Sequence, residues 1–243
     1  PGMFSRWFHV LMLLRSDEGW SESPDPAFQA YGNFIITPYN KDGTEGINFP
    51  WEQTYYQLFF VNQVIDNVKE RGYSVMAKDK VDLILGQAYF IRGLAFWYIA
   101  GTYGKGPLQL SQESNGAIAE QEELYRQALA DFTAAKDVLP VKWSDSADLG
   151  KPTKGGALGM MARCNMQLAG IYKRPWENRE NEAAAFWQAA KQNMDDIFAL
   201  NIYSLVPNWL DNFTEANENN SESLFEINFK NGVTNGKETG CQR

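Results

Sequence analysis

The sequence predicts a mainly α-helical protein, built from antiparallel helix pairs with long irregular loops and little β-structure. Apolar residues recur at three- and four-residue steps over most of residues 51–205, which is the pattern of amphipathic helices. Glycine, proline and polar residues separate these stretches, and one segment near the end alternates apolar with polar residues. The 243 residues are 44% hydrophobic, enough to bury a sizeable core as one large domain or two small ones.

The first clear helical pattern covers residues 51–72. Its apolar stripe repeats at helical spacing, and Gly72 is expected to end the helix as a C-terminal cap. The stripe consists of Trp51, Tyr55, Leu58, Val61, Ile65 and Val68.

The second helix is expected over residues 79–103. Gly86, Gly93 and Ala100 fall seven residues apart on one side of it. Glycine inside a helix costs up to about 1 kcal/mol relative to alanine, so close packing of another helix is the expected compensation. Glycines and Pro107 then predict a sharp exit from the helix over residues 103–110.

Three further helices are expected over residues 120–140, 153–172 and 181–200, with Pro140 ending the first and Thr153 capping the second. We expect the helix at 79–103 to pair with that at 120–140, and the helix at 153–172 with that at 181–200. The 120–140 segment resembles the second half of a tetratricopeptide repeat, which favours an α-solenoid-like bundle. The alternation over residues 223–229 predicts one strand.

The N-terminal region is predicted to contain a buried helix over residues 7–14, followed by an aromatic-rich loop over residues 15–50. A loop of this length is usually functional or disordered, and the number of aromatic residues favours an ordered, functional one. Its rings belong to Trp20, Phe28, Tyr31, Phe34, Tyr39 and Phe49.

Composition excludes several functions. A net charge of −8 argues against a nucleic-acid partner, because binding to phosphates needs a basic surface. Two cysteines and a single histidine provide no metal signature and no histidine-based triad, and Cys164 fits a helix core. No cofactor motif is present, so no cofactor is expected. The apolar run at residues 7–14 is too short to span a membrane, and no spanning segment is expected.

The segment "RSDEGW" leaves three interpretations open. Asp17 and Glu18 are adjacent carboxylates close to Trp20, so the segment is an acid/base pair, a ligand-holding loop or a solvated turn. A glycosidase needs two carboxyls about 5–10 Å apart across a substrate, an arrangement that adjacent residues rarely make. Residues 150–159 suggest either a phosphate cradle or a capped helix start, and residues 211–222 either a calcium loop or a polar loop.

The order of several motifs resembles the SusD-like (RagB/SusD) nutrient-binding outer-membrane lipoproteins of the Bacteroidetes. Each motif is short, but they follow one another in the family's order between roughly residues 12 and 229. They are Trp51-x-x-x-Tyr55 with Asn62 and Ile65-Asp66; Ala88–Ala95 with Tyr103-Gly104 and Pro107-Leu108; Tyr125, Asp131-Phe132 and Leu139-Pro140; Gly150–Lys154; and Trp187, Tyr203–Leu205, Phe213 and Glu222–Ile227.

This resemblance implies a single SusD-like domain over residues 1–243, with a loop region at 15–50 and tetratricopeptide-like helix pairs at 51–205. It implies a glycan-binding protein, not an enzyme, that is exposed on the outer membrane. Its partners would be a glycan and a SusC-like TonB-dependent transporter. The lipid anchor with its signal segment and the C-terminal part of the family are absent from this chain and are expected in the full-length protein.

The family's ligand contacts include the loop that follows its early S-D-[DE] segment, which Ser16-Asp17-Glu18 matches. We therefore expect the ligand-binding residues to be Asp17, Trp20, Tyr31, Tyr39 and Asn40. Aromatic faces stack on sugar C–H faces, while carboxylates and amides bind hydroxyls. A protein-binding scaffold, a peptide-binding member of the family and a glycoside hydrolase are the rival interpretations.

Overall fold

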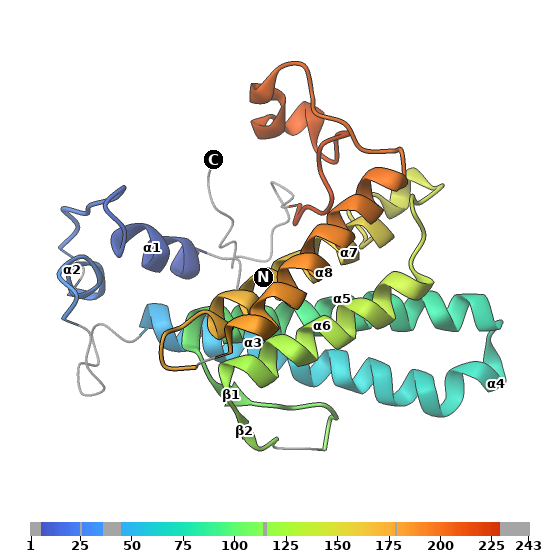
Figure 1. Cartoon of the computed structure of the whole chain (residues 1–243), viewed down its shortest axis with the longest axis horizontal. Coiled ribbons are helices and arrows are strands. Elements are labelled where there is room, and N and C mark those ends of the chain that lie inside the picture. The colour runs from blue at the N-terminus through green and yellow to red at the C-terminus, as the bar shows by residue number, and fades with distance from the viewer. Residues whose placement is uncertain (1–5, 25, 36–44, 114–115, 178, 229–243) are drawn as a thin grey trace. The chain divides into compact units, whose positions relative to one another are not determined.

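The computed structural model describes residues 6–24, 26–35, 45–113, 116–177 and 179–228 (Figure 1). The chain divides into two compact units. Unit 1 comprises Pro1–Gln57 and Phe229–Arg243, and unit 2 comprises Leu58–Asn228. The prediction of a mainly helical fold is confirmed, and the one sheet among the described residues has two short strands.

Unit 1 contains α1 (Arg6–Leu14), α2 (Pro26–Gly32) and the first part of α3 (Glu45–Asn67). Leu11, Leu14 and Tyr31 form its core, while Met12 and Leu13 are exposed, so α1 buries one face only. The prediction of an irregular loop over the whole of residues 15–50 is wrong. The segment contains α2 and the start of α3, whose first residues precede Pro50, a residue that seldom occurs inside a helix.

In unit 2, α3 continues through a turn of π-helix, η2 (Val68–Gly72), into α4 (Tyr73–Val75). The prediction that Gly72 caps the helix is wrong, because Gly72 keeps a right-handed helical backbone with φ −55°. Its lack of a side chain allows the next helix, α5 (Lys78–Tyr103), to approach instead, since a Cβ at this position would lie 3.3 Å from Val81 Cγ1.

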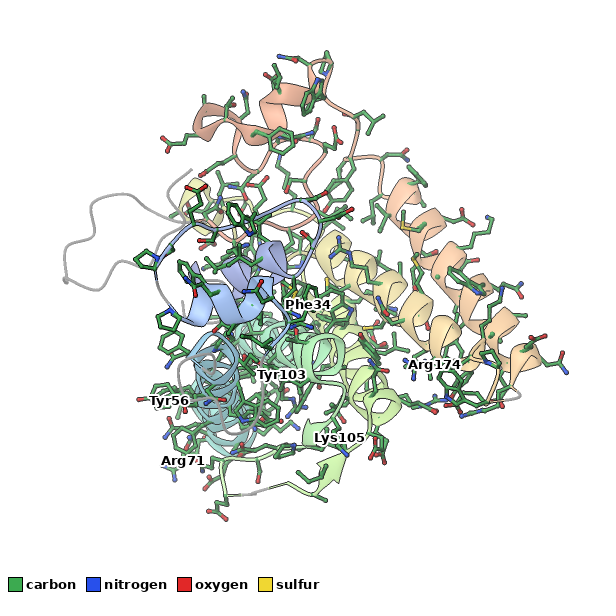
Figure 2. The ribbon with its side chains drawn as sticks, turned by 90° about the vertical axis from the view of Figure 1, so that its left-hand side faces the viewer. Phe34, Tyr56, Arg71, Tyr103, Lys105 and Arg174 are labelled. Carbon is green, nitrogen blue, oxygen red and sulfur yellow. The ribbon has the colours of Figure 1, made fainter. Side chains whose placement is uncertain are left out.

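The second helix, α5 (Lys78–Tyr103), packs antiparallel to α6 (Gln121–Val138) as predicted. A Cβ on Gly86 would lie 2.6 Å from Val138 Cγ2, and one on Gly93 would lie 3.1 Å from the Ala128 carbonyl oxygen. The two glycines therefore provide the close helix approach that their spacing predicts. Between the helices, β1 (Gly106–Pro107) pairs antiparallel with β2 (Ile118–Ala119). Lys105, labelled in Figure 2, is exposed just before β1.

The last two helices, α7 (Lys154–Tyr172) and α8 (Glu180–Ala199), also pair antiparallel. Asn165 Nδ2 donates to Asn193 Oδ1 at 3.0 Å, and the rings of Tyr172 and Phe186 lie 5.2 Å apart. Helix α6 contacts both α5 and α7, and α7 in turn contacts α8. Figure 1 shows these four helices packed together in unit 2. Each helix therefore packs mainly against its neighbours in the sequence, as in an α-solenoid.

Short helical turns connect and follow these helices, and the strand predicted near the end is absent. The short helical turns are η3 (Ser146–Asp148), η4 (Trp209–Phe213) and η5 (Glu215–Asn217). Residues 223–228 form no strand with any described segment. This segment packs against helices instead of pairing in a sheet. The Phe225 ring lies 4.7 Å from that of Phe90, and the Leu224 carbonyl accepts from Thr153 Oγ1 at 3.5 Å.

A buried polar clamp fixes the loop after β1 to α3 and α5. Arg92 forms a two-bond ion pair with Asp131, with nitrogen–oxygen distances of 2.7 and 2.9 Å. Its third nitrogen, Nη1, donates to Asn62 Oδ1 and to the Leu110 carbonyl, both at 3.2 Å. Asn62 in turn donates from Nδ2 to the Gln109 carbonyl at 2.9 Å. The motif residues of α3 and α5 thus hold a loop that is distant in the sequence.

By length and composition, α5 is apolar enough to cross a membrane. However, 61% of its most apolar 18-residue window is buried within the protein, and the core helix of a globular protein has the same composition. We therefore describe α5 as a core helix of unit 2.

Candidate functional site

The segment after α1 in unit 1 presents Trp20 to solvent. Ser16 Oγ donates to the Leu13 carbonyl at 2.8 Å and accepts from the Glu18 amide at 3.2 Å, which turns the chain at the end of the helix. Gly19 then lies against the Leu13 side chain, where a Cβ has no room. The next residue, Trp20, projects outward with 77% of its surface exposed.

Trp20 borders a hollow of about 450 Å³ on unit 1. The remaining lining comes from the following loop and from α2, and it consists of Ser21, Glu22, Phe28, Gln29, Gly32 and Asn33. Hydrogen bonds order this loop, since the Ser23 amide donates to Ser21 Oγ at 3.1 Å and Gln29 Nε2 donates to the Ser23 carbonyl at 3.4 Å.

The lining combines ring faces with short polar groups. Trp20 and the half-buried Phe28 provide apolar faces, and Gln29, Asn33 and Ser21 provide amide and hydroxyl groups that donate and accept hydrogen bonds. A ligand with apolar C–H faces and hydroxyl edges matches this combination. The arrangement can therefore hold a saccharide unit by stacking and by hydroxyl hydrogen bonds.

Of the five residues expected to bind ligand, the structure places Trp20 at the hollow. Asp17 is exposed in the preceding turn and is not part of the lining. Tyr31 is 0% exposed and belongs to the core with Leu11 and Leu14, so its ring is not available as a stacking surface. Tyr39 and Asn40 lie outside the described residues.

Sequence reasoning missed four polar lining residues, Ser21, Glu22, Gln29 and Asn33. No motif marks them, but Gln29 and Asn33 are four residues apart, so they share one side of α2 and its end. The sequence does not predict this short helix, because its aromatic residues Phe28 and Tyr31 look like part of an aromatic-rich loop. Tyr31 lies in this helix, and its helical position turns its side chain into the core.

Glycoside hydrolysis needs two carboxyl groups about 5–10 Å apart across the substrate. Asp17 and Glu18 are both exposed in the turn, and Glu22 is the one carboxylate in the described lining. Within the described part of the chain, no group of three histidine, cysteine, aspartate or glutamate residues is placed to hold a metal ion.

A second ionic cluster joins α6, α7 and α8 in unit 2. Glu122 accepts from Arg126 Nε at 2.8 Å, from Arg179 Nη1 at 2.9 Å and from the Tyr172 hydroxyl. The Arg179 guanidinium also lies over the Tyr172 ring, 3.7 Å from its centre. Partial burial raises the pKa of Glu122, but these hydroxyl and guanidinium groups outweigh it and lower the pKa below its ordinary value. We assign the cluster to helix packing.

Two segments predicted as possible ion sites are accounted for by the fold. Thr153 caps α7, accepting from the Gly156 amide at 3.1 Å, so the predicted capped helix start is confirmed. Residues 211–222 contain η4 and η5 in a polar loop, where Asn220 Nδ2 donates to Asn212 Oδ1 at 2.9 Å.

Comparison with known proteins gives one consistent family. The family model described as "Starch-binding associating with outer membrane", of the SusD-like group, matches residues 27–166, more than half of the chain. SusD-like protein P25 of Formosa agariphila is 24% identical over 195 residues, covering 78% of this chain and 33% of that protein.

Solved structures show the same fold. A SusD superfamily protein from Bacteroides vulgatus has a TM-score of 0.72 and 24% identity, covering 90% of this chain and 43% of its own. Surface glycan-binding protein A from Bacteroides thetaiotaomicron, in complex with laminarihexaose, has a TM-score of 0.70 and 20% identity. The match covers 91% of this chain and 43% of that protein's chain. The chain spans about a third of the length of the curated relative. With its helix pairs, its motif order and this match, the chain belongs to the SusD-like family.

Proposed function

We propose that this chain belongs to a surface glycan-binding protein that captures oligo- or polysaccharide at the Trp20 hollow. The observation that carries the proposal is a tryptophan with 77% of its surface exposed, beside an amide-lined hollow, in a chain of the SusD-like family. Exposing a large apolar ring to water is unfavourable, and a sugar face that stacks on the ring removes this surface from water.

The captured glycan is then passed to a TonB-dependent outer-membrane transporter of the SusC-like kind. The full-length protein is lipid-anchored and exposed at the cell surface, where it meets polysaccharide outside the cell. A shallow site with few buried hydrogen bonds gives weak binding, and weak binding permits release to the transporter. Support for the location comes from the outer-membrane description of the family model, while the transporter partner is what the family resemblance implies.

Binding without catalysis is the expected chemistry. The described lining of the hollow contains a single carboxylate, Glu22, whereas a glycosidase uses two. The family model and the relatives described above indicate a carbohydrate-binding family and no enzyme family.

Affinity electrophoresis of the full-length protein through gels containing laminarin or other neutral polysaccharides tests the site. Trp20→Ala is expected to weaken retention about five- to tenfold, because aromatic stacking contributes about 1 kcal/mol and 1.4 kcal/mol corresponds to tenfold. Trp176→Ala is the matched control. This residue is 76% exposed in the α7–α8 loop, outside the Trp20 hollow, and its loss should leave retention unchanged.

Equal retention of Trp20→Ala and the unchanged protein would show that the hollow does not bind the glycan. Release of reducing sugar from the same polysaccharides would contradict a purely binding role. If no glycan or peptide is retained while a protein partner co-purifies from outer membranes, the scaffold interpretation replaces this one.

A further inference from the structure

A second hollow, of about 440 Å³, lies on unit 2 beside the start of α7. Two segments line it, one within residues 141–153 and one within residues 202–226. We propose that this hollow is a second saccharide-binding site, which takes one or two units of a neutral oligosaccharide. The proposal rests on the proposed function for its ligand class, while its location comes from the lining described below.

Trp143 is held at the hollow by its own indole nitrogen. Nε1 donates to the Pro152 carbonyl at 3.0 Å, and the Lys151 ammonium lies over the ring, 5.3 Å from its centre. The indole is therefore fixed in orientation although the ring is only half buried. A fixed, partly exposed aromatic face loses little conformational entropy when a ligand stacks on it.

Tyr203 forms a second aromatic surface. Its ring lies directly over Gly155 in the first turn of α7, where a Cβ would collide with the ring. Its hydroxyl is 3.3 Å from Thr153 Oγ1, the same atom that accepts from the Gly156 amide. The absence of a side chain at Gly155 and the capping threonine thus together determine where the phenol sits.

Polar groups elsewhere in the segment within residues 202–226 complete the lining, and hydrogen bonds hold them in place. The Ser204 amide donates to the Ser221 carbonyl at 2.9 Å, and Ser221 Oγ donates back to the Ser204 carbonyl at 3.0 Å. Asn219 donates from Nδ2 to Asn228 Oδ1 at 3.3 Å. Amide and hydroxyl groups that are already oriented suit a ligand with many hydroxyls.

The balance of charge selects a neutral ligand. Lys142 and Lys151 line the hollow together with one carboxylate, Glu226. Asp148 pairs with Lys151, so that Glu226 and Asp148 together offset the two ammonium groups of the lining. An anionic ligand would gain little net attraction here, whereas an uncharged polyhydroxylated ligand has no charge to desolvate.

Fluorine NMR of the full-length protein labelled with 5-fluorotryptophan separates the two sites. Loss of a signal in Trp143→Phe and in Trp20→Phe assigns each residue, and Lys151→Ala provides a second assignment of Trp143 through its contact with the ring. Titration with laminarihexaose is expected to shift the Trp143 signal. Tyr203→Phe, which removes a lining hydroxyl, should raise the midpoint of that shift several-fold while leaving the Trp20 midpoint unchanged.

The outcomes distinguish this inference from the proposed function. Movement of the Trp20 signal alone overturns the second site and supports the first, and movement of the Trp143 signal alone does the reverse. Unchanged signals of both residues, across laminarihexaose and other neutral oligosaccharides, overturn both. A Trp143 shift with oligouronates but not with neutral sugars overturns the neutral ligand class.

Discussion

Arg92 is the residue at which α3, α5, α6 and the loop after β1 meet. Its side chain and that of Asp131 are only 8% and 3% exposed, so the pair interacts where water screens little. Such a pair contributes modest net stability, because both charges lose hydration, but removing one partner leaves the other uncompensated.

We expect Arg92→Met to lower the free energy of unfolding by about 3–5 kcal/mol, since it leaves the Asp131 carboxylate buried without its partner. Urea denaturation followed by circular dichroism measures the loss. The double variant Arg92→Met/Asp131→Leu is the control and should recover much of it. A double variant no more stable than the single one would show that the bonds to Asn62 and Leu110, and not the ion pair, carry the effect.

The Glu122 cluster makes the folding stability of unit 2 depend on pH. Because the folded protein lowers the pKa of Glu122, the stability it contributes is fully present above the ordinary value of 4.5 and is lost as pH falls through the lower folded value. We expect Glu122→Gln to reduce stability by about 1–2 kcal/mol at pH 7 and by much less at pH 3. Thermal melts at the two pH values measure this, and an equal loss at both would refute the ionic explanation.

At the scale of elements, glycines determine how closely the helices approach. Gly86→Ala should destabilise the protein by about 1–3 kcal/mol, because the new methyl group would meet Val138 Cγ2 at 2.6 Å. Gly170→Ala is the matched control in α7, where a Cβ has nothing within 4 Å. It should stabilise by up to about 1 kcal/mol through helix propensity. Thermal or urea unfolding compares the two, and equal effects would contradict close packing at Gly86.

The sequence was sufficient to predict helices whose stripes are long and whose ends carry clear signals. Pro140 and Thr153 mark the end of α6 and the start of α7 within a residue or two. The sequence was insufficient where tertiary packing overrides the usual local preference of a glycine or a proline. Gly72 does not end its helix as a C-terminal cap, and a Cβ there would lie 3.3 Å from Val81 Cγ1. Pro50 lies inside α3, although a proline usually precedes or ends a helix.

The helical junctions also bring distant ends of elements together. Arg174, labelled in Figure 2, follows α7 and donates from Nη2 to Gln121 Oε1 at 2.7 Å, at the start of α6. Sequence periodicity contains no information on such contacts, because they depend on which helix ends are adjacent after packing.

For the molecule as a whole, the order of the family motifs predicted the architecture, but it contained no information on which loop residues are exposed. Trp20 and Tyr31 were both expected to bind ligand because they lie in the loop region after Ser16-Asp17-Glu18, but Trp20 is exposed whereas Tyr31 is fully buried. The difference depends on a short helix, α2, whose existence periodicity over seven residues does not establish. Trp143 and Tyr203, sixty residues apart, become neighbours of one hollow only through the packing of α7.

The packing of each helix in unit 2 mainly against its neighbours in the chain has a consequence for synthesis. Most contacts between α5 and α6 connect residues that leave the ribosome within a few seconds of each other, at about 5–20 residues per second. Local contacts of this kind form rapidly. The α5–α6 pair can therefore assemble, with its Arg92–Asp131 bond, before α7 and α8 have been translated, and each later helix finds a folded surface to join.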